Sequence, residues 1–195
     1  NVIILAQLYL QQEKPANTLS LMKEHVVLVN QNPRLQAVRG TALVAQGQAE
    51  AAKQVFARAL ERCQNINQAE AVSHQMTAAF DPAESLKLTS SITQRFDNLY
   101  FELLASRLQI SMNQYSKALD RLGSIKPQLS PDKSRMRLIH RQLEGTALQG
   151  TGNYGKAREI YESLLVDYPN DLNTLNNLAY LLADNLGEPE AAEPV

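Results

Sequence analysis

Apolar residues recur along this chain at intervals of three to five, with polar residues between them. The segment from residue 138 to 148 shows this well, because Leu138, Ile139, Leu143, Ala147 and Leu148 recur at spacings of three to five, which is a helical period. Runs that alternate apolar and polar residues, as a half-buried strand requires, are absent from the sequence. The pattern predicts an all-α chain of short helices.

Proline and capping residues mark where several helices begin. In the stretch 81–84 (DPAE) the aspartate caps the helix, the proline fits its first turn, and Glu84 closes a capping box. The stretch 130–132 (SPD) predicts a second start in the same way. Asn170 and Asp171 are the capping residues of a third predicted helix.

Pairs of small residues spaced twelve apart recur along the chain. The pairs are Gly40 and Ala52, Ser106 and Ala118, Gly145 and Ala157, and Ala179 and Ala191. An apolar residue follows each pair four positions later, at Phe56, Leu122, Tyr161 and Val195. Two antiparallel helices approach closely only where small residues lie at the crossing, and larger apolar residues then fill the seam. The spacing therefore predicts a series of helical hairpins.

The offsets between successive pairs give the length of the repeat. The last two pairs are offset by 34. The first two are offset by 66, close to two periods, which predicts a degenerate repeat between them with crossing positions near His74 and Leu86. The offset of 39 from Ser106 to Gly145 is five more than 34, which predicts about five inserted residues in the loop 126–134. Because one hairpin cannot bury its apolar face alone, the hairpins are expected to stack.

This pattern resembles the tetratricopeptide repeat (TPR), whose motif is roughly W-x2-L-G-x2-Y, then A-x3-F-x2-A, then P. One repeat matches at Gly145, Leu148, Ala157, Tyr161, Leu164 and Pro169, and the last matches at Leu175, Leu178, Ala179, Leu182 and Ala191. The family's tryptophan position is held by Gln36, Glu102, Arg141 and Leu175. The resemblance implies a right-handed α-solenoid of antiparallel helix pairs.

We expect residues 1–195 to form a single TPR-like solenoid that is a fragment of a longer chain. The sequence starts inside an apolar helical pattern without an initiator methionine and stops abruptly at its end. The expected repeats cover approximately 1–32, 33–65, 66–98 (degenerate), 99–133, 138–171 and 172–195 (truncated).

The stretch 150–157 (GTGNYGKA) nearly matches two phosphate-binding motifs, G-x-G-x-x-G and G-x-x-x-x-G-K-[ST]. Both motifs must follow a strand, whereas a helical pattern precedes this stretch, and Ala157 lacks the hydroxyl that binds magnesium. The repeat offers a better interpretation, since Gly152 aligns with Gly47 and Asn113. Glycine and asparagine suit a residue with positive φ beyond a helix end. The stretch is therefore predicted to be the turn inside one hairpin.

Composition and charge exclude several classes of function. The net charge of −1 and the pI of about 6.4 argue against nucleic acid as a partner. The apolar stretches are far shorter than the roughly 20 residues that span a membrane. A cytoplasmic and a periplasmic location both fit a chain with Cys63 as its one cysteine.

The titratable residues form no catalytic or metal-binding motif. His25, His74 and His140 are widely spaced, with no His-Glu-x-x-His motif, and the acidic residues are dispersed. His74 falls at a predicted helix crossing, and nothing in the sequence orients a histidine toward Cys63 as a nucleophile pair would need. We expect no enzyme activity, no metal and no cofactor.

A basic cluster covers the inserted loop and the helix after it. Its members are Lys133, Arg135, Arg137, His140 and Arg141. The cluster is interpreted either as a solvated face or as a contact for an acidic partner or a phosphate.

The resemblance also implies a concave groove lined by the first helix of each hairpin. The corresponding positions are Arg34, Ala37, Thr41, Val44, Tyr100, Leu103, Arg107, Ile110, Ile139, Gln142, Thr146, Gln149, Asn173, Asn176, Tyr180 and Ala183. Among these, partner contacts are expected from Arg34, Thr41, Tyr100, Arg107, Gln142, Thr146, Asn173, Asn176 and Tyr180. The positions of the carboxylate clamp found in some TPR domains hold Ala37, Leu103, Gln142 and Asn176, with no lysine, so this clamp is not expected.

The predicted function is a non-enzymatic scaffold that binds a protein or extended peptide. Long bacterial TPR proteins, which the chain resembles, often serve the assembly of envelope, secretion or polysaccharide-export machinery. A homodimer through the end repeats is a further expectation. The alternatives are a regulatory or substrate-recruiting segment of a larger enzyme and a nucleic-acid-binding helical repeat.

Overall fold

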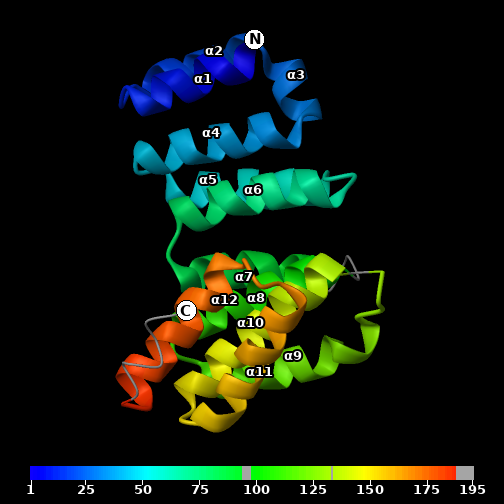
Figure 1. The fold of residues 1–195 in the computed structure, drawn as a ribbon. Coiled ribbons are helices and arrows are strands. Elements are labelled where there is room, and N and C mark those ends of the chain that lie inside the picture. Colours follow the sequence, from blue (N-terminus) through cyan, green and yellow to red (C-terminus); the bar gives the residue numbers. More distant parts are fainter. Residues whose placement is uncertain (94–97, 133, 188–195) are drawn as a thin grey trace. The chain divides into compact units, whose positions relative to one another are not determined.

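The computed structural model describes residues 1–93, 98–132 and 134–187, and all of its regular elements are helices (Figure 1). The all-α fold class is confirmed. The chain divides into two compact units, residues 1–95 and 96–195, each described here by itself. The predicted seam positions Ala191 and Val195 lie outside the described residues.

The first unit contains three helical hairpins. Its helices are α1 (Val2–Gln11), α2 (Pro15–Glu24), α3 (Val26–Gln31), α4 (Pro33–Ala45), α5 (Ala49–Glu61), α6 (Ile66–Ala79) and α7 (Pro82–Thr93). Helix α4 packs against α1, α2 and α3 on one side and against α5 and α6 on the other. The hairpins α1–α2, α4–α5 and α6–α7 therefore stack in chain order.

The second unit continues the same construction. Its helices are α8 (Leu99–Ser111), α9 (Tyr115–Ile125), the short 3-10 turn η1 (Lys126–Gln128), α10 (Ser134–Gly150), α11 (Tyr154–Asp167), α12 (Leu172–Tyr180) and the π-turn η2 (Leu181–Asn185). Helix α10 packs on α8 and α9 and pairs with α11, which contacts α12. The inserted residues form η1 and an extra first turn of α10, which starts ahead of its predicted repeat position at 138.

Each hairpin is closed at a pair of fully buried small residues. The pairs Gly40–Ala52, Ser106–Ala118 and Gly145–Ala157 are buried as predicted, and Ala6–Thr18 forms another pair at the same spacing. In the first hairpin the Thr18 hydroxyl donates to the Ala6 carbonyl at 3.2 Å. The small side chains bring the two backbones together at the crossing.

The degenerate repeat has a pair of its own, one residue away from the predicted positions. His74 is exposed and Leu86 is half-buried, whereas their neighbours Ser73 and Ser85 are both 0% exposed. Helices α4, α6 and α8 start at residues 33, 66 and 99, so successive repeats here are 33 residues apart, one fewer than the offset of 34 between the last two pairs. A step of 34 from Gly40 reaches His74, whereas a step of 33 reaches Ser73. The prediction of His74 as a crossing residue is therefore wrong.

The residue that lies against each crossing determines how small the crossing residue must be. In the two hairpins that cross at a glycine, an aromatic residue stands sixteen positions after that glycine. These residues are Phe56 after Gly40 and Tyr161 after Gly145, and both are 0% exposed. A Cβ on Gly40 would lie 2.6 Å from the Phe56 ring, and one on Gly145 would lie 2.5 Å from the Tyr161 ring. The glycines make room for the rings.

The turn between paired helices uses a left-handed residue in four hairpins. Gly47, Asn113 and Gly152 have φ values of 74°, 58° and 79°, which confirms the predicted turn. Glu13 takes the same place in the first hairpin with φ 55°. In the degenerate repeat the place is held by Phe80, with extended backbone at φ −124°, whose ring meets Phe56 edge-to-face at 5.7 Å.

The helix starts follow the predicted capping residues with two exceptions. The Glu84 carboxylate pairs with Lys53 and Lys87 instead of closing the predicted capping box. Asp81 Oδ1 accepts from the backbone N–H of Ala83 and Glu84, both at 2.9 Å, and Asp171 caps α12 through a bond from the Thr174 N–H at 2.8 Å. The stretch 130–132 is not a helix start, since α10 begins at Ser134. Pro131 and Asp132 form a turn instead, a conformation that the fixed φ of proline also suits.

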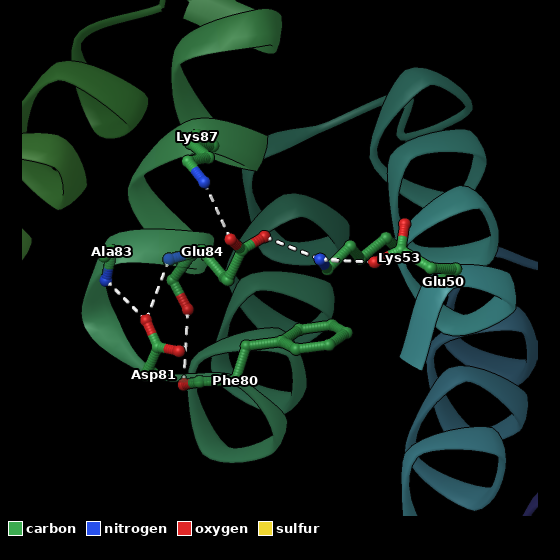
Figure 2. A network of polar contacts seen from close by, with 8 residues as sticks. Glu50, Lys53, Phe80, Asp81, Ala83, Glu84 and Lys87 are labelled. Carbon is green, nitrogen blue, oxygen red and sulfur yellow. Dashed lines mark hydrogen bonds and ion pairs between the residues drawn. The ribbon is translucent and has the colours of Figure 1, made fainter. Parts of the chain in front are cut away.

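Glu84 carries an ion-pair network between α5 and α7 (Figure 2). Its carboxylate lies 2.9 Å from Lys53 Nζ and 2.8 Å from Lys87 Nζ, while Lys53 also meets Glu50 at 2.8 Å. Hydrogen bonds from Lys53, and then from Lys87, lower the pKa of Glu84 to about 2, and bonds to Glu50 and Glu84 raise the pKa of Lys53. The carboxylate thus links neighbouring hairpins.

The lowered pKa of Glu84 predicts a dependence of stability on pH. Its contribution is complete above the ordinary carboxyl pKa of about 4.5 and is lost as the pH falls toward 2. At pH 7, Glu84→Gln is expected to lower the melting temperature of the first unit only slightly, because Glu84 and Lys53 are both partly exposed. The decrease in melting temperature between pH 5 and pH 3 should be smaller in this variant than in the parent. Thermal unfolding followed by circular dichroism measures both.

The matched control for that experiment is Glu24→Gln, since Glu24 is exposed in the same unit and has no ion pair among the described residues. Its acid dependence should equal that of the parent. If Glu84→Gln also kept the full acid dependence, the network would not contribute to acid sensitivity.

Candidate functional site

A hollow of about 430 Å³ opens in the second unit, where the first helices of successive hairpins end. Residues from α8 to η2 line it: Ile110, Tyr115, Thr146, Gln149, Gly150, Tyr154, Asn177, Tyr180 and Asn185. None of these side chains is charged. The hollow therefore combines three tyrosines with amides and one aliphatic residue.

The left-handed turns position two of the tyrosines. Tyr115 and Tyr154 are the first residues of α9 and α11, directly after the turns at Asn113 and Gly152. The Tyr115 hydroxyl donates to Asn113 Oδ1 at 2.7 Å. Its ring lies against Gly150, where a Cβ would come within 2.4 Å of the ring. Gly150 is thus a surface on which Tyr115 packs.

Hydrogen bonds fix the polar wall of the hollow. Gln149 Nε2 donates to Asn185 Oδ1 at 2.6 Å, which ties α10 to η2. Tyr161 lies behind this wall and its hydroxyl donates to Thr146 Oγ1 at 3.3 Å. Burial raises the pKa of Tyr161, so the hydroxyl stays protonated and remains a donor at neutral pH. The wall is held in place from inside the protein.

The π-turn η2 brings Asn185 into this wall. Gly187 follows with φ 68° and is offset by 35 from Gly152, whereas the predicted crossing residues Gly145 and Ala179 are offset by 34. The π-turn over Leu181–Asn185 takes up the additional residue inside the helix. Leu181 and Leu182 stay buried while Asn185 meets Gln149.

Comparison with known families identifies this architecture. The model described as "Tetratricopeptide repeat" matches residues 33–66, which cover α4, α5 and the first residue of α6. The chain therefore contains a tetratricopeptide repeat at these residues. No curated protein matches it in sequence. A TPR repeat supports a general role as a protein–protein interaction scaffold, and TPR hairpins are typically non-enzymatic modules.

The structure places the predicted groove residues of this TPR chain in different surroundings. Thr146 and Tyr180 line the tyrosine hollow together, and Tyr180 is 59% exposed. Asn173 and Asn176 are exposed on α12, and Arg107 is exposed on α8, but none of the three lines the hollow. The tyrosine hollow thus unites two of the predicted residues.

Gln142 is occupied within the protein. Its Nε2 donates to Asp171 Oδ2 at 2.6 Å and to Thr174 Oγ1 at 3.2 Å, which connects α10 to the start of α12. Thr174 is fully buried. This glutamine therefore joins two hairpins of the second unit.

Tyr100 is half-buried, and its ring packs edge-to-face on Phe101 at 5.4 Å. In the first unit, the Thr41 hydroxyl donates to the Ala37 carbonyl at 3.2 Å. Arg34 is exposed and lines a separate hollow of about 430 Å³, whose other residues are Gln31, Asn32, Pro33, Asn65, Asn67 and Gln68.

Seven residues of the tyrosine hollow were not predicted as partner contacts. Ile110 and Gln149 were expected only as groove positions, and the other five lie outside the predicted groove: Tyr115, Gly150, Tyr154, Asn177 and Asn185. The two tyrosines belong to second helices, outside the positions that the family pattern assigns to the groove. A sequence signal for these two tyrosines exists, because the aligned stretches 111–118 (SMNQYSKA) and 150–157 (GTGNYGKA) both place a tyrosine just after the turn.

The basic cluster is smaller than predicted. His140 is 1% exposed, and its Nε2 lies 2.9 Å from the Leu122 carbonyl oxygen, so it joins α10 to α9 inside the protein. Arg135 and Arg137 are exposed and Arg141 is half-buried, while Lys133 lies outside the described residues. Among the described members, the surface part of the cluster is therefore formed by arginines.

Candidate chemistry elsewhere has little support in the described part of the chain. No group of three or more histidine, cysteine, aspartate or glutamate side chains there is arranged to hold a metal ion. Burial raises the pKa of the Cys63 thiol to about 11, which disfavours the nucleophilic thiolate. No helix in the described ranges is both long and apolar enough to cross a membrane.

Proposed function

We propose that the second unit binds an extended, uncharged segment of a protein partner in the tyrosine hollow. The observation that supports this is the set of three tyrosines, Tyr115, Tyr154 and Tyr180, around a hollow that no charged side chain lines. Tyrosine gives a large contact area at a low cost in side-chain entropy. A side chain that enters between the rings loses its water without leaving a protein charge unpaired.

The amides give the hollow its polar specificity. Asn177 is half-buried and carries both donors and an acceptor, which match the backbone groups of an extended peptide. Gln149 and Asn185 already bond each other, so their remaining groups are held in fixed positions. A preorganised wall lowers the entropy cost of binding.

The wider role in envelope, secretion or polysaccharide-export assembly is supported by resemblance to long bacterial TPR proteins alone. Within the proposal, Thr146 and Tyr180 contact the segment, and Asn173 and Asn176 extend the contact along α12. Arg34, Thr41, Tyr100 and Arg107 are proposed to contact other parts of the partner.

Site-specific cross-linking tests the proposed hollow. A photoreactive benzoylphenylalanine in place of Tyr180 is expected to cross-link a protein partner in cells of the source organism. Once the cross-linked partner is identified, Tyr180→Ala should weaken its affinity about tenfold or more, as truncation of a central tyrosine does at protein interfaces. Fluorescence anisotropy with the partner's cross-linked peptide measures this affinity.

The control places the same photoreactive residue at Val166, which is 83% exposed on α11 and does not line the hollow. Val166 should give no cross-link to that partner. Equal cross-linking from both positions, or none from position 180, would contradict the proposed site.

A further inference from the structure

Hydrogen bonds inside the tyrosine hollow turn its polar oxygens toward the protein and leave amide N–H groups for a ligand. Asn185 Oδ1 accepts from Gln149 Nε2 at 2.6 Å, and Gln149 Oε1 faces the buried Tyr161 hydroxyl at 3.5 Å. The Thr146 hydroxyl donates to the Gln142 carbonyl at 2.9 Å and accepts from Tyr161. The two N–H groups of Asn185 Nδ2 have no partner in the part of the chain that the structure describes.

The remaining polar groups of the hollow change this balance only slightly. The amide of Asn177 brings both a donor group and an acceptor oxygen. The hydroxyls of Tyr154 and Tyr180 form no bond within the described ranges and can either donate or accept. The backbone carbonyls of Ile110 and Gln149 are occupied, since the turns that follow donate to them at 2.9 Å and 3.0 Å. Among the side-chain groups of the hollow, those fixed as donors therefore outnumber those fixed as acceptors.

A ligand that matches this balance carries backbone carbonyls and few N–H groups. Proline has a carbonyl and no N–H, and a polyproline II helix forms no hydrogen bonds within itself, so its carbonyls are unpaired. An ordinary extended segment brings one N–H per residue, and an N–H that is buried without an acceptor is costly. All residues that line the hollow belong to helices, so they present no strand edge that could pair with such N–H groups.

The aromatic part of the hollow also fits proline. The Tyr115 ring lies against Gly150, and Tyr154 packs on the buried cluster of the second unit. Both rings are therefore held in place before a ligand arrives. A polyproline II helix is preformed as well, so it loses little entropy when it docks on aromatic side chains. The uncharged proline ring leaves no charge to be paired in a hollow without charged side chains.

We propose that the segment bound in the tyrosine hollow is rich in proline and binds as a polyproline II helix. This inference rests on the proposed function, because it states the chemistry of the segment that the hollow binds. The proline rings pack against Tyr115, Tyr154 and Tyr180, and the amide N–H groups of Asn177 and Asn185 donate to the carbonyls of the segment.

Fluorescence anisotropy with a fluorescein-labelled decapeptide of proline tests the inference on the 195-residue chain. The control peptide is a labelled decapeptide of alternating glycine and serine, which is uncharged and has the same number of residues but carries backbone N–H groups. The proline peptide is expected to bind about tenfold more tightly than the control peptide. Tyr180→Ala should weaken the binding of the proline peptide about tenfold.

The variant Asn185→Asp tests the amide donors. It removes the two unpaired N–H groups and keeps an oxygen to which Gln149 can donate, so the wall of the hollow is retained. Binding of the proline peptide should weaken about fivefold, because acceptors then face the carbonyls of the peptide. The control Asn170→Asp makes the same change of charge at an exposed residue of the second unit that does not line the hollow, and it should bind like the parent.

Three results would overturn the inference: equal binding of the two decapeptides, an Asn185→Asp chain that binds the proline peptide like the parent, or an equal weakening by Asn170→Asp. A partner segment that cross-links at position 180 but contains no proline would also overturn it and would leave the proposed function intact. The absence of any cross-link from position 180 would contradict the proposed function itself. The inference and the proposed function therefore have separate tests.

Discussion

Replacement of Tyr161 by alanine is expected to lower the free energy of unfolding of the second unit by about 3–5 kcal/mol. Tyr161 is 0% exposed and fills the seam against Gly145, so truncation leaves a cavity that rigid helices cannot close. Its hydroxyl also bonds Thr146 at 3.3 Å. Urea unfolding followed by circular dichroism measures the loss.

Two companion variants separate the causes. Tyr161→Phe keeps the ring and removes the long hydroxyl bond, so its cost should stay near about 0.5–1.5 kcal/mol. Tyr180→Ala removes the same atoms from a side chain that is 59% exposed, and its cost should stay within about 0.5 kcal/mol. If Tyr161→Ala cost no more than Tyr180→Ala, the seam would not be the centre of stability in this unit.

Gly40→Ala is expected to destabilise the first unit by about 1–3 kcal/mol, although alanine is the better helix former. The added Cβ would lie 2.6 Å from the Phe56 ring, and this ring is 0% exposed and cannot turn away. Overpacking therefore outweighs the gain in helix propensity. Differential scanning calorimetry and urea unfolding measure the effect.

The diagnostic test is a rescue by the facing residue. In the double variant Gly40→Ala, Phe56→Leu, the two changes should be much less than additive, because leucine leaves space for the methyl group. The hairpin with Ser106 and Leu122 already combines a larger crossing residue with a smaller facing residue. Additive losses would show that the ring and the glycine do not share one space.

The architecture was predictable because the crossing residues and the turn residues repeat together. Gly47, Asn113 and Gly152 were predicted to have positive φ, and all three do. Small residues twelve apart identified the seams without any knowledge of the helix boundaries. Both signals are local requirements of steric fit, and neighbouring contacts cannot easily override them.

The degenerate repeat was misplaced because its signal is weak and its length differs. Ser73 and Ser85 satisfy the crossing requirement, but serine is common and gave no clear pair. The shorter steps into and out of this hairpin moved the crossing positions away from His74 and Leu86. Phe80 stands where other hairpins have a left-handed residue, so the turn gave no signal either.

The candidate site was only partly predictable from family positions. Thr146 and Tyr180 line the hollow, whereas Gln142 is bound by Asp171 and Thr174 inside the protein. The position of a residue on a helix determines the direction in which its side chain leaves the backbone. A long polar side chain can then bend toward a hydrogen-bonding partner within reach. Tyr115 and Tyr154 line the hollow because the turns of two hairpins lie close together in space. The spacing of residues along one helix does not predict such a contact between hairpins.

The fit between ring and glycine also restricts the order in which this sequence could have changed. A ring at position 56 or 161 can be accepted only after the residue sixteen positions earlier has lost its side chain. Once the ring is present, the glycine cannot revert without a loss of stability. Each such seam therefore fixes an order of change: the loss of the small side chain costs helix propensity but opens space for a larger core, and the ring that fills this space then prevents the return.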